Sequence, residues 1–278
     1  MSKRASRRPP LLEPSTARRR PVRREARLPS PRSRVVKARV AGRHDRLGRA
    51  ELHSVMRRVV TGDPVALLGL ERFDHVDLAE LRDVASEVWG WDVDAPTVAI
   101  EPDRLMSSLR VARDRVVDVG RRGGRILLAT GRPASLLPLH QHLARLARSA
   151  GGDLLDAGEA GPISAAGRAS ARLWWLGGVA VLTDGDALLA DPGIEAVEEL
   201  LFTVPFPDLV VADRAYAGGA LRAGIEVVAL ADLDALALGL AAVRGLPVTV
   251  VPLHERRPAP AYAALEPLLS LPPPSEAT

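Results

Sequence analysis

Short apolar runs that alternate with helical segments fill the chain from residue 125 onward and constrain its fold more than any other feature. Each run is short and rich in aliphatic residues. The runs are RILLATG (125–131), GDLLDAG (152–158), DLVVADR (208–214), EVVALAD (226–232) and PVTVVPL (247–253). Such alternation indicates βα units and a mostly parallel sheet with helices on both faces. We therefore expect an α/β fold with a Rossmann-like sheet.

One stretch departs from this pattern. VAVLTDGDALLA (179–190) has Asp184-Gly185 at its centre, and this dipeptide is typical of a tight hairpin. A local antiparallel pair of strands is therefore expected there. Helices are expected near 134–150, 192–203, 215–224, 233–245 and 260–269.

A mainly helical region, residues 34–120, precedes the α/β core at 121–271. Its clearest helix is 101–120, which begins with an acidic, proline-containing turn. The apolar face of this helix consists of Leu105, Leu109, Ala112, Val116 and Val119. Further helical segments lie at 50–60 and 75–89. The region would form either a cap over the core or a separate subdomain.

Charge divides the chain near residue 49. Residues 1–49 carry 17 Lys and Arg against three acidic residues, whereas 50–278 carry 21 basic and 31 acidic residues. The folded body is therefore acidic and a poor binder of nucleic acid. The Arg/Pro/Ser-rich tail 1–33 is expected to be disordered, and the end at 272–278 to be flexible. The tail is either a solvated extension or the one segment through which nucleic acid or another acidic partner would bind.

The composition excludes several classes of site. The chain has no cysteine, which excludes disulfides, thiolate nucleophiles and cysteine-based metal sites. Because a chain without disulfides suits a reducing compartment, we expect a cytoplasmic location. No apolar run approaches the ~20 residues of a membrane-spanning helix, and the basic N-terminus lacks the apolar stretch of a secretory signal. The motifs HExxH, GxSxG and the P-loop do not occur in the sequence.

Polar residues follow the first run of the expected sheet. Ligands of an open parallel sheet bind at the carboxyl ends of its strands. Here Thr130 offers a hydroxyl, and Gly131 permits close backbone approach of a ligand. Arg132 offers a guanidinium group, and Pro133 marks the start of a helix. Together they predict a phosphate-binding site. The alternative is an ordinary helix start with a surface arginine.

Two aspartates close neighbouring runs in the same way, Asp213 in VVAD and Asp232 in ALAD. Two carboxylates at one sheet edge suit a hydrated Mg²⁺ ion or general acid–base chemistry. The alternative is that each aspartate caps the helix that follows it. By contrast, His140 and His142 are two residues apart on an expected helix and point to different faces, so they are not a joint metal pair.

The order of several motifs resembles an actinobacterial family usually labelled predicted phosphatase. The motifs are RILLATGRPASLL, VAVLTDGDALLA, PDLVVADRAYAGGALRAGIEVVALAD and VTVVPLHE, and the similarity covers roughly 34–255. The functional residues that the resemblance carries over are Thr130, Gly131, Asp213 and Asp232. The chain departs from the family pattern at Arg132 and Arg214, where that pattern has histidine, and it lacks an asparagine after Asp232.

The segment ATGRP (129–133) also resembles the phosphate-binding motif of haloacid-dehalogenase-type sugar phosphatases. Those enzymes require an earlier DxDxT motif at a strand end and a later acidic motif. In DVDAPT (92–97) the threonine is misplaced by one position, and Gly185-Asp186 with Asp191 imitates the later motif inside the expected hairpin.

The sequence therefore predicts a metal-assisted phosphatase that acts on a small phosphorylated metabolite. Thr130, Gly131 and Arg132 would bind phosphate, Asp213 and Asp232 would hold Mg²⁺ or another divalent metal, and the two aspartates with Arg132 would be catalytic. The rival prediction is a non-catalytic protein that binds a phosphorylated metabolite. The missing family side chains favour this rival, and the retained aspartates oppose it. A third possibility is a structural protein in which the turn at residues 130–133 has only a packing role.

Overall fold

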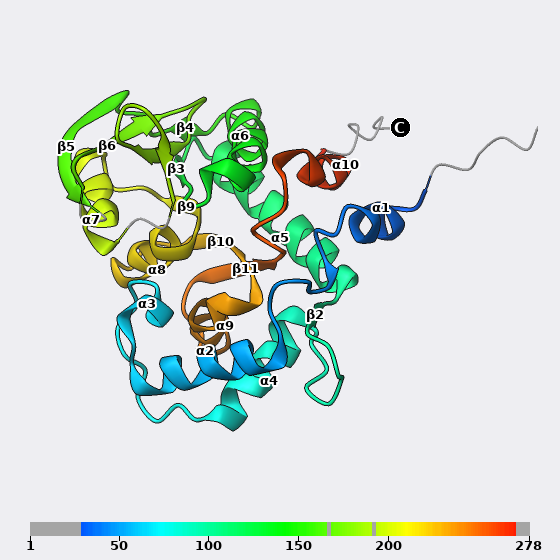
Figure 1. Cartoon of the computed structure of the whole chain (residues 1–278). Helices are drawn as coiled ribbons and strands as arrows, with labels where there is room; N and C mark the ends of the chain where they lie inside the picture. Colours follow the sequence, from blue (N-terminus) through cyan, green and yellow to red (C-terminus); the bar gives the residue numbers. More distant parts are fainter. Residues whose placement is uncertain (1–28, 166–167, 191–192, 271–278) are drawn as a thin grey trace, which may run out of the picture.

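The computed structural model of the chain describes residues 29–165, 168–190 and 193–270. The predicted tail up to residue 28, the end at 272–278 and Asp191 lie outside these residues. The fold is α/β, and it combines one large mixed sheet with helices on both faces and a helical N-terminal region (Figure 1). The predicted fold class is thus confirmed.

Parallel strands form the centre of the large sheet and one of its sides. They are β3 (Arg125–Ala129), β4 (Asp153–Leu154), β9 (Leu209–Asp213), β10 (Val227–Ala231) and β11 (Val248–Pro252). Strands β11, β10, β9 and β3 are neighbours in that order, and every pair among them is parallel. All residues of β9 and β10 are buried, as strands covered on both faces should be.

Antiparallel strands extend the sheet on the other side of β3. They are β5 (Glu159–Ala165), β6 (Arg168–Trp175), β7 (Ala180–Thr183) and β8 (Leu188–Leu189). The predicted hairpin is confirmed, since β7 and β8 pair in antiparallel fashion around Gly185, whose φ is 98°. Strands β5 and β6 were not predicted from the sequence. They form a meander with β7 at the far side of the sheet from β11 (Figure 1).

Helices cover both faces of the sheet. On one face, α5 (Pro102–Arg121) contacts β11, and α6 (Pro133–Ser149) contacts β3 and β4. On the other face, α8 (Arg214–Arg222) contacts β9 and β10, and α9 (Leu236–Val243) contacts β11. Helix α7 (Ile194–Thr203) packs on α8. The predicted apolar face of α5 is confirmed, because all five of its predicted residues are buried.

The N-terminal region packs directly on the α/β core. It contains α1 (Pro31–Lys37), β1 (Gly42–Arg43), α2 (Arg49–Thr61), α3 (Pro64–Leu67), α4 (Leu78–Trp89) and β2 (Ala99–Ile100). The indole Nε1 of Trp89 donates to the carbonyl of Ala231 at 3.1 Å, at the end of β10. A Cβ atom at Gly239 in α9 would lie 2.5 Å from the Trp89 ring, so α4 and α9 are in close contact. Buried side chains of this region and of the core belong to one hydrophobic cluster.

Two predicted boundaries need correction. Residues 31–33 of the predicted tail form the first turn of α1, because the Ser30 side chain caps that turn and Val35 is buried. The predicted helix at 260–269 is a 3₁₀ segment, η2 (Ala259–Leu265), followed by the short α10 (Glu266–Leu269). Prolines at its start interrupt regular helical hydrogen bonding. None of the helices in the described part of the chain has the length and apolar character needed to cross a membrane.

Candidate active site

The carboxyl ends of three parallel strands bring the predicted site residues to one edge of the sheet. Thr130, Gly131 and Arg132 follow β3, Asp213 ends β9, and Asp232 follows β10. The same edge receives His254 and Glu255 after β11 and His44 after β1. The last three residues were not predicted. For His254 and Glu255 the strand-end rule was a sufficient signal, because VPLHE follows the last predicted strand.

Asp213 holds the corner between β3 and α6. Its carboxylate accepts hydrogen bonds from the Thr130 hydroxyl and, at 2.8 Å, from the backbone amide of Gly131. The same hydroxyl oxygen accepts from the Arg132 amide at 3.0 Å. Burial raises the pKa of Asp213, and these hydrogen bonds act against that rise. In this structure the predicted phosphate-binding hydroxyl and amide therefore face the Asp213 carboxylate.

His140 lies behind this corner on α6. Its Nδ1 contacts the carbonyl of Leu136 at 3.1 Å, so this nitrogen carries the proton. The other nitrogen, Nε2, lies 3.8 Å from Asp213 Oδ2, and burial lowers the pKa of His140. His142 lies on a more exposed face of α6, as the sequence predicted.

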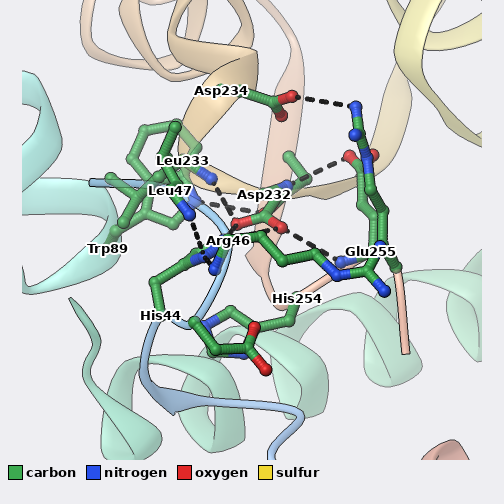
Figure 2. A network of polar contacts seen from close by, with 12 residues as sticks. His44, Arg46, Leu47, Trp89, Asp232, Leu233, Asp234, His254 and Glu255 are labelled. Atoms are coloured by element: carbon green, nitrogen blue, oxygen red, sulfur yellow. Dashed lines mark hydrogen bonds and ion pairs between the residues drawn. The ribbon is translucent and has the colours of Figure 1, made fainter. Parts of the chain in front are cut away.

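Asp232 has a different environment from Asp213. Figure 2 shows Asp232 together with His44, His254 and Glu255. Its carboxylate accepts from the amide of Leu233 at 2.8 Å and contacts His44 Nε2 at 3.1 Å. Burial alone would raise the pKa of Asp232, but the hydrogen bonds from His44 and from the Leu233 amide hold it below its usual value. Asp232 is therefore a carboxylate at neutral pH. It also caps η1 (Leu233–Ala235), which is the alternative role that the sequence left open.

The tautomer of His44 follows from its backbone contacts. Its Nδ1 accepts hydrogen bonds from the amides of Arg46 and Leu47, at 3.1 and 2.8 Å. The proton of the neutral ring is therefore on Nε2, which donates it to Asp232. A metal bound at Nε2 would require a proton on Nδ1, where two amide protons already point. His44 is consequently a hydrogen-bond donor that orients Asp232.

His254 has the opposite tautomer. Its Nδ1 donates to the carbonyl of Arg39 at 2.9 Å; Arg257 Nη2 lies farther away, at 3.3 Å, and donates to Asp45. Nε2 of His254 therefore has a free lone pair, and within the described ranges this buried atom has no hydrogen-bond partner. Burial lowers the pKa of His254, which keeps this lone pair available.

The side chains of His44, Asp232 and His254 surround a small cavity. Potential ligand atoms of these three residues all lie within 4.8 Å of one another. Among the described residues, these three form the one cluster of His, Asp or Glu side chains that could hold a metal ion. The cavity has a volume of about 60 Å³, which is enough for an ion and a small number of waters. Asp213 does not belong to this group.

Glu255 is the second buried acid at this edge. Its Oε1 accepts from the amide of Asp232 at 3.1 Å, and its Oε2 lies 3.5 Å from Arg132 Nε and 3.9 Å from Arg214 Nη1. Arg214 also binds Asp234 at 2.9 Å. Burial raises the pKa of Glu255 to about 8; the charge of Arg214 acts against this rise, and the neighbouring carboxylates add to it. Glu255 is therefore mostly protonated at neutral pH.

The residues of the second resemblance do not gather at this edge. Asp92 and Asp94 lie in the loop between α4 and β2, which belongs to the small two-stranded sheet. Asp186 lies in the turn between β7 and β8, where Asp184 Oδ1 accepts from its amide at 3.2 Å. Asp208 lies at the amino end of β9, away from this edge, and accepts from the Arg125 amide at 2.7 Å.

The sequence matches known proteins over most of its length. The family model described as Phosphatase matches residues 29–270. A protein of Streptomyces coelicolor named Phosphatase SCO2771 is 31% identical over 216 residues, which is 74% of this chain and 80% of that protein. The range that the family model matches extends over the N-terminal region as well as the α/β core, and it includes every residue of the edge described above. The chain therefore belongs to the Phosphatase family.

Proposed function

We propose that this protein is a metal-assisted phosphatase that hydrolyses a phosphomonoester of a small metabolite. The observation that carries the proposal is the convergence of two arginines, a protonated acid and an Asp–His pair at one sheet edge. Membership of the Phosphatase family supports the same reaction class. Each component has a distinct task.

Phosphate would bind between Arg132 and Arg214. Both side chains are largely buried, and both approach Glu255 Oε2, at 3.5 and 3.9 Å. Arg132 precedes α6 and Arg214 begins α8, and neither helix start is capped by a side chain. Two guanidinium groups and two helix N-termini favour a dianion at this place. Arg132 thus keeps its predicted role, while Thr130 and Gly131 support the corner beside it.

The metal would bind between Asp232 and His254. The free lone pair of His254 Nε2 and the ionised Asp232 face the same small cavity, and both are buried. A mixed nitrogen and oxygen donor set suits Mn²⁺ or Zn²⁺ better than the predicted Mg²⁺, which prefers oxygen ligands. We assign Asp213 to the corner, because both of its carboxylate oxygens already accept hydrogen bonds there.

A bound divalent ion would polarise a phosphoryl oxygen and lower the pKa of a coordinated water. The residues of the chain would orient the ester and handle protons. Arg132 and Arg214 would hold the phosphoryl oxygens, and Glu255 would give its proton to the ester oxygen as the P–O bond breaks. Water supplies the new P–O bond, and one of its protons returns to Glu255, so that alcohol and hydrogen phosphate leave.

The test uses the full chain after treatment with a chelator. Phosphate release from a panel of phosphomonoesters would be measured with Mn²⁺, Zn²⁺ and Mg²⁺ added singly. We expect release that needs a metal, is strongest with Mn²⁺ or Zn²⁺, and falls at least about 100-fold in Arg132→Gln. His142→Gln, on the more exposed face of α6, is the control and should match the wild type. Binding of esters by folded, metal-loaded protein without any release would favour the non-catalytic alternative instead.

A further inference from the structure

A second, larger cavity lies beside the start of α8. Its volume is about 630 Å³, within the ~300–1,000 Å³ typical of small-molecule sites. Its walls come from the segment around α3, from the start of α7 and from the start of α8. The apolar side chains among its lining residues are Pro64, Val65, Leu67, Leu68, Leu70, Ile194 and Ala215, and the charged ones are Arg72, Glu195, Arg214 and Arg222. In Figure 1, α3 lies next to α8, with α7 on the other side of α8.

Arg214 connects this cavity with the phosphate edge. It lines the cavity, and its Nη1 also lies 2.9 Å from Asp234 and 3.9 Å from Glu255. Its φ is 52°, a left-handed conformation that a non-glycine residue adopts at some energetic cost. The chain turns sharply there, so that one residue contacts both the polar edge and the apolar cavity.

Two close contacts fix the wall around α3. A Cβ atom at Gly218 would lie 2.0 Å from the carbonyl oxygen of Leu68, so α8 and this wall touch backbone to backbone. Gly69 has a φ of 87°, and a Cβ there would lie 2.8 Å from Ile194 Cδ1. The wall is therefore preformed. Val65, on the same wall, is 67% exposed and remains open to a ligand.

We propose that this cavity binds the apolar organic group of a phosphomonoester whose phosphate lies between Arg132 and Arg214. The assignment rests on the proposed function and specifies the substrate class. The alcohol part of the substrate is a compact aromatic or branched aliphatic group, because the wall offers mainly aliphatic side chains to it. A small polar ester such as glycerol 3-phosphate would bury much less apolar surface against this wall.

The test is titration calorimetry on the full chain, with a chelator present to prevent turnover. The ligands are 1-naphthyl phosphate, glycerol 3-phosphate, inorganic phosphate and 1-naphthol. We expect 1-naphthyl phosphate to bind at least about tenfold more tightly than glycerol 3-phosphate, owing to burial of its ring. Val65→Trp should narrow the cavity and reduce this preference without changing the affinity for inorganic phosphate. Val111→Trp, at a 55% exposed valine of α5, is the matched control and should keep the preference.

The two proposals fail in different ways. Equal affinities for the two esters, or a preference that Val65→Trp leaves intact, would overturn the assignment of the cavity even where the enzyme releases phosphate. If 1-naphthol binds in a manner that Val65→Trp weakens, but neither ester nor inorganic phosphate binds, the apolar cavity stands and the phosphate site of the proposed function is wrong.

Discussion

Asp213 and Asp232 end neighbouring strands with the same local sequence pattern, yet the structure gives them different surroundings. Asp213 is enclosed, and its oxygens accept from Thr130 and Gly131. Asp232 faces a cavity together with His44 and His254. Their pKa values shift in opposite directions, upward for Asp213 because of burial and downward for Asp232 because of its hydrogen bond from His44. A strand-end position thus brings a carboxylate to the edge, and neighbours from elsewhere decide what it does.

The largest expected effect is on stability, at the enclosed aspartate. Asp213→Ala would leave the Thr130 hydroxyl and the Gly131 amide buried without an acceptor. We expect the free energy of unfolding to fall by about 2–4 kcal/mol, measured by urea denaturation. A loss below about 1 kcal/mol would show that Asp213 does not hold the corner, and the contrast between the two aspartates would disappear.

The next largest expected effect is a loss of metal affinity when His254, the neighbour of Asp232 at the cavity, is replaced. His254→Ala removes one of two proposed ligands, while Arg39 O keeps its hydrogen bond from Arg257 Nε, so the local fold should persist. We expect Mn²⁺ or Zn²⁺ affinity to fall more than about 100-fold, measured by calorimetry. Asp213→Asn should leave this affinity within about threefold of the wild type. An equal loss of metal affinity in the two variants would contradict the different roles of Asp213 and Asp232.

Glu255 gives a pH dependence with a definite sign. Its pKa is raised by burial from the usual 4.5 to about 8, so the folded state binds this proton more tightly than the unfolded state does. Its contribution to stability is therefore complete below about pH 4.5 and is lost as pH rises through 8, with a slope of up to about 1.4 kcal/mol per pH unit.

Glu255→Gln should remove this slope, because glutamine imitates the protonated acid. Urea unfolding of metal-free protein at several pH values between 5 and 8 would measure it. Glu266→Gln, at an exposed glutamate of α10, is the control and should unfold like the wild type. Parallel curves for wild type and Glu255→Gln would mean that Glu255 is ionised in the folded protein at neutral pH.

The smallest expected effect concerns the orientation of Asp232 by His44. His44→Ala should weaken metal binding about tenfold, in the lower range for partners of a metal ligand. Glutamine at this position carries an N–H donor at nearly the same reach, so His44→Gln should recover most of the affinity. If alanine and glutamine weaken binding equally, the hydrogen bond from His44 Nε2 is not what orients Asp232.

Much of the fold could be predicted from local patterns. The parallel strands and α5 follow from apolar runs and helical spacing, which depend on neighbours in sequence. Strands β5 and β6 could not be predicted in the same way, because they depend on pairing with β7. In β6 the alternation of buried Leu173 and Trp175 with the 40% exposed Trp174 is a short signal that is easily overlooked.

The site was predictable where it follows strand ends and unpredictable where tertiary contact builds it. Asp213 and Asp232 follow the strand-end rule, and so do His254 and Glu255, which the same rule should have included. His44 lies in an arginine-rich stretch, 188 residues away from Asp232 in sequence. Its contact with Asp232 depends on the packing of residues 39–44 along the end of β11, where Val40 O accepts from the His254 amide at 2.8 Å.

The most direct measurement is anomalous diffraction from crystals of the full chain grown with Mn²⁺ and phosphate. We predict a manganese peak within about 2.0–2.3 Å of both an Asp232 oxygen and His254 Nε2, with phosphate between Arg132 and Arg214. Asp213 should still accept from Thr130 and Gly131 in the same crystal. A peak coordinated by Asp213, or phosphate bound by the Thr130 hydroxyl in place of that carboxylate, would contradict the division of roles between the two aspartates.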